Sequence, residues 1–159
     1  MSKIEVVGKV SYTYKKLARY VAEEVIKYMN QPTQIEVAIE FVSEKEIQRL
    51  NKENRNIDKV TDVLSFPSTE IAVGEILDID NQEYAYLITD DGYLHFGDMA
   101  LCLKQTKRQA KEYGVSVKSE IKKLVIHSML HLMGYDHIED SDYEVMNIKE
   151  LELDKLIEI

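Results

Sequence analysis

The feature that most constrains this chain is the run of eleven residues from 127 to 137, which holds three of its four histidines. His127 and His131 are four positions apart, so on an α-helix they share one face with Cβ atoms about 5–6 Å apart. Gly134 follows one turn later, and glycine commonly ends a helix because it adopts left-handed backbone at little cost. A chain that reverses there brings His137 toward the first two rings. The spacing therefore predicts a buried helix that ends in three converging imidazoles.

Three neutral imidazoles around one point are typical of a zinc site that keeps a fourth position for water. Zinc lowers the pKa of such a water from about 16 toward about 7. We expect one Zn²⁺ ion held by His127, His131 and His137, with Asp136 orienting an imidazole through its second nitrogen. The competing interpretation is a pair of core histidines. It accounts for the helical spacing but not for Gly134 and His137 as well.

Two other classes of zinc protein can be weighed against the motif. Zinc peptidases carry His-Glu-x-x-His, in which the glutamate is the general base, and here the second position is Ser128. A peptidase-like hydrolase is therefore disfavoured, although a base from elsewhere stays open. A ribosome-assembly factor with a structural metal is the second alternative. Structural zinc sites have four protein ligands, and no fourth is evident because Cys102 is distant in sequence.

The composition limits the setting in which such a site can act. The 159 residues suit a single domain spanning 1–159, which buries about 70% of its unfolded surface without staples. No apolar run reaches the roughly eighteen residues of a membrane span, and the N-terminus has no hydrophobic signal core. No membrane partner is expected. A single cysteine cannot form an internal disulfide, which suits a reducing cytoplasm.

The net charge of −9 at first disfavours a nucleic-acid partner, but the charge is unevenly distributed. Residues 68–92 hold seven acids and no bases, and residues 138–159 hold eight acids and two bases. Removing these contributions of −7 and −6 from the total leaves +4 for the remaining residues. The acidity therefore belongs to a loop or hairpin insertion at 68–92 and to the C-terminal tail, while the part that bears the histidines is mildly basic.

Periodic patterns predict an α+β fold. Alternating apolar residues at 35–41 indicate a strand with one buried face. Apolar residues at helical spacing in 117–133 indicate a buried helix that carries His127 and His131. The expected strands are 3–7, 35–41, 60–66 and 93–101, and the expected helices are 12–29, 43–54, 103–113, 117–133 and one from 141 onward. This order predicts a single domain with a mixed sheet of about four strands and helices packed on it.

Two kinds of local signal refine this order. Capping boxes, in which a serine and a glutamate each satisfy a free amide, are expected to open helices at Ser43-Glu-Lys-Glu46 and Ser141-Asp-Tyr-Glu144. In the acidic segment, residues 84–88 and 93–96 are expected to pair as a hairpin across the turn at 89–92.

Basic side chains outside the motif suggest a phosphodiester substrate. The planar guanidinium of Arg55 suits two phosphate oxygens and could stabilise charge on a phosphodiester, the alternative being a surface salt bridge. A basic stripe on the expected helix 103–113 could follow a nucleic-acid backbone, the alternative being a solvated helix face. The candidate substrate-binding residues are Lys59, Lys104, Lys107, Arg108 and Lys111.

Several motifs occur together in this chain, namely His127-x-x-x-His131-x-x-Gly134-x-Asp136-His137, Asn51, Arg55, Asp58, Thr61-Asp-Val-Leu-Ser-Phe-Pro67 and Gly97-Asp98. In this combination they resemble the motifs of the YbeY family of bacterial ribosomal-RNA maturation endoribonucleases. The resemblance covers nearly the whole chain.

The resemblance implies a single-domain α+β metalloprotein whose zinc ligands are His127, His131 and His137. It also implies that Arg55 lies in the cleft and takes part in activity, and that Asp98 is structural. The family acts on single-stranded RNA, chiefly in the processing of small-subunit ribosomal RNA and in ribosome quality control. We therefore expect a zinc-dependent endoribonuclease whose partners are RNA and the small ribosomal subunit. Whether its nucleophile is metal-bound water or the RNA 2′-hydroxyl stays open.

Three features depart from the family pattern. Ser128 stands where glycine is common, a small-for-small change with little expected effect, and His95-Phe96 stands where an aliphatic pair is usual. We expect His95 to be structural or at the surface. The acidic segment 68–92 is longer than expected. It could project beside the cleft, where its charge would repel RNA, or lie away from it.

Overall fold

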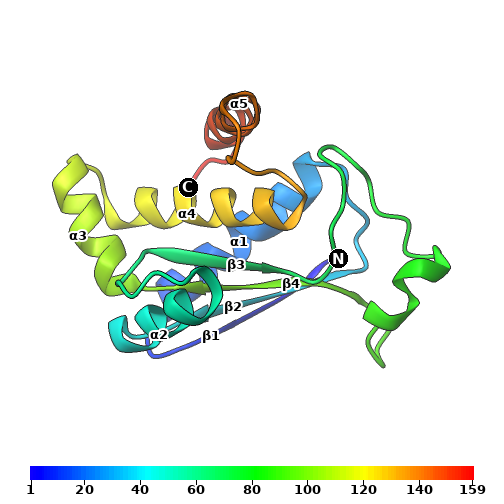
Figure 1. The fold of residues 1–159 in the computed structure, drawn as a ribbon, viewed down its shortest axis with the longest axis horizontal. Helices are drawn as coiled ribbons and strands as arrows, with labels where there is room; N and C mark the ends of the chain where they lie inside the picture. The colour runs from blue at the N-terminus through cyan, green and yellow to red at the C-terminus, as the bar shows by residue number, and fades with distance from the viewer.

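The alternating residues 35–41 form an inner strand of a four-stranded sheet in the computed structural model, which describes residues 1–159 (Figure 1). Along the sheet the order is β1-β2-β4-β3. The strands β1, β2 and β4 run parallel, whereas β3 pairs antiparallel with β4. Their bounds are Lys3–Val7 for β1, Ile35–Phe41 for β2, Val63–Pro67 for β3 and Leu94–Leu101 for β4. The predicted α+β class with a mixed four-stranded sheet is confirmed.

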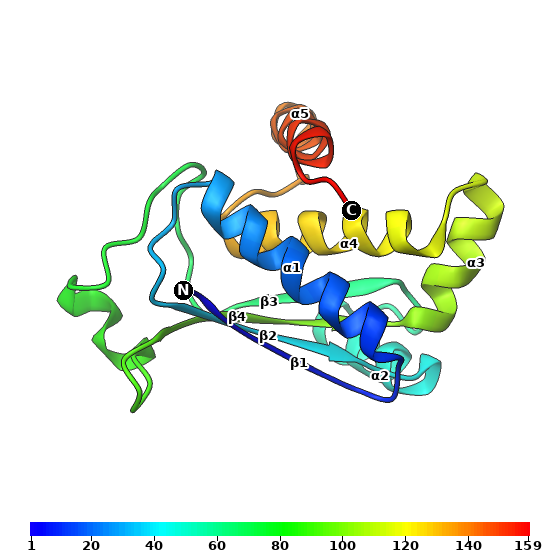
Figure 2. The same cartoon turned by 180° about the vertical axis from the view of Figure 1, so that it is seen from behind.

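Two long helices, α1 and α4, pack together over one face of this sheet (Figure 2). The other face near β3 is covered by α2, because the adjacent residues Val63 and Leu64 belong to two separate apolar clusters. In Figure 1, α5 lies on the outer side of α4, away from the sheet. The helices are α1 Tyr12–Tyr28, α2 Glu44–Arg55, α3 Leu103–Tyr113, α4 Val117–Leu132 and α5 Asp140–Leu156. None of them is long and apolar enough to span a bilayer.

The helix α4 is the most deeply buried of the five, and its apolar positions explain why. Its predicted inward-facing residues are all buried, namely Ile121, Leu124, Val125, Met129 and Leu132. The Ser116 side chain accepts a hydrogen bond from the amide of Ser119 and so caps the helix start. Helix α4 is thereby held along the sheet as a rigid support for the histidines it carries.

The predicted hairpin in the acidic segment is wrong. A short 3₁₀ helix, η1 (Gln82–Leu87), occupies most of its first half, and only Ile88 bridges to Leu94. The turn itself forms, since Thr89 donates its amide to the carbonyl of Tyr93 at 2.7 Å. Tyr84 is buried in the main apolar cluster, and this long-range packing, together with the cap that Asn81 provides, favours the helical turn over a strand.

Two predicted boundaries also need correction. The strand β3 starts at Val63 instead of residue 60, because the Asp62 side chain takes the amide of Val63 at 2.7 Å and residues 60–62 form no ladder. The second capping box is wrong. Helix α5 begins at Asp140 after the N-cap Glu139, so Ser141 lies inside the first turn, where the flanking acids favour a helix start through its dipole.

The first capping box is half correct. Ser43 accepts a hydrogen bond from the amide of Glu46 at 3.1 Å. The Glu46 carboxylate does not reach back to the cap, because it binds the guanidinium of Arg49 instead.

Candidate metal centre and cleft

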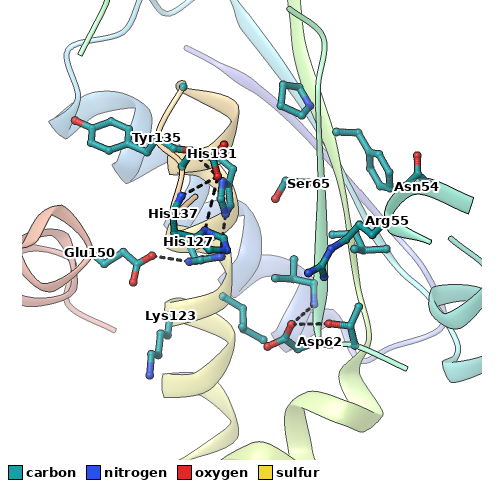
Figure 3. Close-up of a pocket in the computed structure, with 18 of the residues that line it drawn as sticks. Asn54, Arg55, Asp62, Ser65, Lys123, His127, His131, Tyr135, His137 and Glu150 are labelled. Atoms are coloured by element: carbon teal, nitrogen blue, oxygen red, sulfur yellow. Dashed lines mark hydrogen bonds and ion pairs between the residues drawn. The ribbon is translucent and has the colours of Figure 1, made fainter. Parts of the chain in front are cut away.

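The three histidines of the motif converge at the C-terminal end of α4 (Figure 3). Each ring offers one nitrogen, and the three nitrogens lie within 4.8 Å of one another. The Nε2 atoms of His127 and His131 are 3.1 Å apart. The ring of His137 lies 5.7 Å from that of His127 and 5.0 Å from that of His131, centroid to centroid. The arrangement is therefore a compact set of three nitrogen donors.

The turn after α4 brings His137 back, and it depends on Gly134. This residue has a φ of +92°, which a side chain makes costly. A Cβ at this position would also lie 2.3 Å from the carbonyl oxygen of Ile71, so the start of the acidic segment packs directly on the turn. The amide of Tyr135 then closes the turn on the carbonyl of Leu130 at 3.0 Å. Glycine is required here for both conformation and close approach.

The hydrogen bonds on the outer ring nitrogens test whether this set fits a metal. His131 Nδ1 lies 2.9 Å from the carbonyl of Tyr135, and because a carbonyl only accepts, Nδ1 carries the proton. His127 Nδ1 lies 2.5 Å from the Glu150 carboxylate, which favours the same tautomer. The two facing Nε2 atoms then both present lone pairs. Two acceptors in contact lack a donor between them, so the set fits a cation such as Zn²⁺.

The environment of His131 supports a neutral ring. Burial, together with the neighbouring His127, lowers the pKa of His131 to about 4. Neutral imidazole is the form that binds zinc.

Two groups that contact the rings were not found by sequence reasoning, and Asp136 is placed differently from expectation. Asp136 accepts the amide of His137 at 2.7 Å, and its carboxylate lies 4.0 Å from His137 Nδ1, too far for a hydrogen bond. The outer nitrogens of the other two rings are instead held by Glu150 and by the carbonyl of Tyr135. A backbone carbonyl leaves no signal in a sequence, and Glu150 is far along the chain.

A cleft of about 1020 Å³ opens over the histidines. It is lined by β3, by one side of α4, and by the segments 69–71 and 134–137. Arg55, the last residue of α2, also lines it, and Figure 3 shows this side chain across the cleft from His127. The structure therefore brings the predicted arginine and the predicted ligands into one cavity.

Arg55 is the base of α2 that lines the cleft, and it lacks an acidic partner. Lys45 also forms no ion pair, but it lies outside the cleft lining. Arg49 pairs with Glu46 and Glu53, and Lys52 pairs with Asp58 at 3.9 Å. Arg55 forms none of the ion pairs in the structure, although a surface salt bridge was the competing interpretation of this residue. Its guanidinium is therefore available to an anion in the cleft.

The predicted basic stripe does not reach the cleft. Lys104 and Arg108 both pair with Glu44, at 3.4 and 2.6 Å, and Lys107 lies over the ring of Tyr14. The side of α3 that lines the cleft carries different residues, Gln109 and Tyr113. The candidates that lie outside the lining are Lys59, Lys104, Lys107, Arg108 and Lys111, whereas Lys123 of α4 is part of it.

Ser128 faces away from the open side of the cluster. It is fully buried, and its hydroxyl lies 2.7 Å from that of Ser65 on β3. This contact fastens the histidine-bearing turn of α4 to the sheet. A glutamate would not fit between α4 and β3 at this position, so the usual peptidase base has no room here.

The acidic segment lies mostly away from the cleft. Of its seven acids only Glu70 lines the cavity. The segment then runs to the far end of the sheet (Figure 1), held by Gln31, which bonds the carbonyl of Glu75 and the amide of Leu77. Asp91 pairs with Lys3 at 2.8 Å. Most of the negative charge of the segment 68–92 therefore lies away from the cleft.

Known proteins resemble this chain over nearly its whole length. A family model described as endoribonuclease YbeY matches residues 3–157. A protein named endoribonuclease YbeY from Lachnospira eligens is 38% identical over 150 residues, covering 91% of this chain and 89% of the relative. One of the same name from Clostridium acetobutylicum is 42% identical over 137 residues, covering 85% and 82%.

A solved structure shares the fold. The solution structure of a Thermotoga maritima protein superposes with a TM-score of 0.60 at 29% identity, covering 98% of this chain and 87% of the other. The family match over nearly the whole length, together with relatives above 35% identity that align across most of their own length, shows that this chain belongs to the YbeY endoribonuclease family.

Proposed function

We propose that this chain is a zinc-dependent endoribonuclease that cuts single-stranded RNA during the maturation of small-subunit ribosomal RNA and in ribosome quality control. The observation that carries the proposal is the placement of three imidazole donors and an unpaired arginine on opposite sides of one cleft. The printed names of the relatives support RNA as the substrate class. A substrate of this kind places the activity in the cytoplasm, with the small ribosomal subunit as partner.

The division of labour within the cleft follows from its residues. Zinc held by His127, His131 and His137 would supply a Lewis acid and a water of lowered pKa. Arg55 binds the scissile phosphate through its planar fork and stabilises the negative charge that develops during cleavage. The contact between Ser65 and Ser128 keeps α4 against the sheet, so the ligands and the arginine hold a fixed separation while the phosphate enters between them.

The lining of the cleft also suits single-stranded RNA. Two aromatic side chains with exposed surface lie in its walls, Phe66 and Tyr113, whereas Tyr135 is buried in the core. Unstacked bases pack on aromatic rings, and this contact is open to single strands but closed to bases inside a duplex. Lys123 adds a positive charge on the same side of α4, where it can pair with a neighbouring phosphate.

An RNA cleavage assay tests the proposal. The wild-type protein with Zn²⁺ should cut a single-stranded RNA and spare its duplex, and Arg55→Ala should lose about 10²–10³-fold in kcat, the usual cost of losing one group that stabilises transition-state charge. Arg49→Ala, which removes a paired arginine of the same helix, is the matched control and should cut normally. Unchanged cleavage by Arg55→Ala contradicts the role given to this residue.

The ends of the products identify the nucleophile. A 5′-phosphate with a free 3′-hydroxyl, or a 3′-phosphate without a cyclic precursor, indicates attack by water. A 2′,3′-cyclic phosphate indicates attack by the RNA 2′-hydroxyl and excludes water as the attacking group. The role of Arg55 in binding phosphate is the same in both routes.

A further inference from the structure

One side of α5 packs on α4, and a carboxylate interrupts its apolar surface. Met146, Leu153 and Ile157 are almost fully buried. Helical spacing places Glu150 between them on the same side, with its side chain only 20% exposed. Burying a carboxylate costs free energy unless it gains a strong partner, so an apolar residue would be the ordinary choice here.

The partner of this carboxylate is the outer nitrogen of a candidate ligand (Figure 3). Glu150 accepts a hydrogen bond from Nδ1 of His127 at 2.5 Å. This bond holds the proton on Nδ1 and turns the lone pair of Nε2 toward His131, which is the orientation that ligation needs. It also limits rotation of a ring that is otherwise one-third exposed.

The rest of α5 is attached mainly to the same helix, α4. Lys122 of α4 donates to the carbonyls of Asp154 and Ile157 at 2.9 and 3.0 Å and pairs with the Asp154 carboxylate at 3.0 Å. These contacts hold the last turns of α5, whereas Glu150 holds its middle. Release of α5 from α4 therefore removes the partner of His127, and rotation of His127 removes a polar contact of α5.

We propose that Glu150 is a positioning residue for the metal centre, acting through His127, and that metal binding and the docking of α5 on α4 stabilise each other. The proposal rests on the zinc site proposed above. Coupling between two binding events is reciprocal. The factor by which docked α5 strengthens zinc binding is therefore the factor by which zinc strengthens the docking of α5.

Substitutions at Glu150 test the first part. Glu150→Leu fills the space between the apolar residues of α5 but accepts no hydrogen bond, and loss of such an outer partner weakens metal affinity about 10–100-fold. Glu150→Gln keeps a carbonyl acceptor and should lose less. The matched control is Glu152→Gln, which removes the same charge from the exposed side of α5, where it pairs with Lys149. The measurement is competition for Zn²⁺ between the purified protein and a chromophoric chelator, after circular dichroism confirms folding.

Hydrogen exchange tests the second part. Zinc should slow the exchange of amides in α5 of the wild-type protein by about the same 10–100-fold, and this slowing should vanish in Glu150→Leu. Wild-type zinc affinity in both Glu150 variants overturns the positioning role, and α5 exchange that ignores zinc in the wild type overturns the coupling. If the wild-type protein itself binds no zinc, the metal site proposed above fails and this inference fails with it.

Discussion

Two histidines of this protein contact a carboxylate through Nδ1, yet their surroundings assign them different chemistry. On β4, His95 places Nδ1 2.7 Å from Glu36 and Nε2 3.1 Å from Asp98. On α4, His127 places Nδ1 2.5 Å from Glu150, but its Nε2 faces another imidazole at 3.1 Å. The group that faces the second nitrogen is what separates them. A second carboxylate favours a charged ring, and a second imidazole leaves a lone pair for a metal.

The electrostatics of the two sites agree with this distinction. Burial opposes the charged form of His95, but the carboxylates of Asp98 and Glu36 outweigh it and raise the pKa. Burial and a neighbouring imidazole lower the pKa of His131. A protonated ring cannot bind zinc, so the same residue type is stabilised as a cation at one site and as a neutral donor at the other.

The largest predicted effect comes from removing one member of the cluster. Zinc sites with four ligands bind with about 10–16 kcal/mol, or roughly 2.5–4 kcal/mol for each ligand. His131→Ala should therefore weaken zinc binding several hundred-fold, measured by elemental analysis and chelator competition, and abolish RNA cleavage. His95→Ala is the matched control and should keep one Zn²⁺ ion per chain. Equal zinc content in both variants would remove the distinction between the two sites.

Metal removal is the next largest effect. Zinc at 100 times its dissociation constant stabilises a folded protein by about 2.7 kcal/mol. Chelation should lower the free energy of unfolding by that amount, and the melting temperature with it, but leave the fold intact, because a core cluster of 31 buried residues does not depend on the metal. Far-ultraviolet circular dichroism with and without chelator measures this. Complete unfolding on chelation would favour the structural-metal alternative, and His131→Ala should show no shift on chelation.

A substitution at Gly134 tests whether the turn that brings His137 toward the other two rings is needed for zinc binding. Gly134→Ala forces a Cβ into left-handed backbone and onto the carbonyl of Ile71, at a cost of about 1–3 kcal/mol. We expect a lower urea midpoint and weaker zinc binding, since His137 moves with the turn. Gly92→Ala is the matched control, because its φ of +87° is similar but no atom lies within 4 Å of the added Cβ. Equal losses in the two variants would mean that close packing at Gly134 is unimportant.

Most of the fold could be predicted because it depends on neighbouring residues. The strand 35–41 has a two-residue period, and the helix 103–113 ends before Gly114, which adopts left-handed backbone. The hairpin failed because burial of Tyr84 in the distant core decides the conformation of its own segment. The local sequence pattern therefore predicts helices and strands where packing and propensity agree. It fails where a contact with residues distant in sequence decides the conformation of the segment.

The residues of the site also divide into those that the sequence predicts and those that only the fold places. The convergence of the three histidines could be predicted because two of them share a helix face and the third follows a glycine turn. The basic stripe on α3 could not be placed, because Glu44 of α2 and Tyr14 of α1 take up its side chains in the fold. Glu150 could not be found because only the docking of α5 brings it to His127. The groups around the three histidines are therefore placed by contacts between elements that are distant in sequence, and the histidine motif alone does not predict them.

The smallest predicted effect is a change of the free energy of unfolding with pH that comes from His95. Because its pKa in the folded protein is raised above the unfolded value of about 6.5, its contribution to stability is complete below about pH 6.5 and is lost as the pH rises through the folded pKa. The ring is partly exposed, so the contribution should stay below about 1 kcal/mol.

The measurement is the difference in the free energy of unfolding between the wild-type protein and His95→Gln, taken from urea titrations at a series of pH values. The three clustered histidines are present in both proteins, so their contribution to stability largely cancels in this difference. The difference should favour the wild type in acid and shrink toward alkaline pH, while zinc content stays the same in both proteins. A difference that grows with pH would mean that His95 is held neutral between its two carboxylates. A loss of zinc in His95→Gln would mean that the strand histidine supports the metal site, and in either case the contrast with His127 would be wrong.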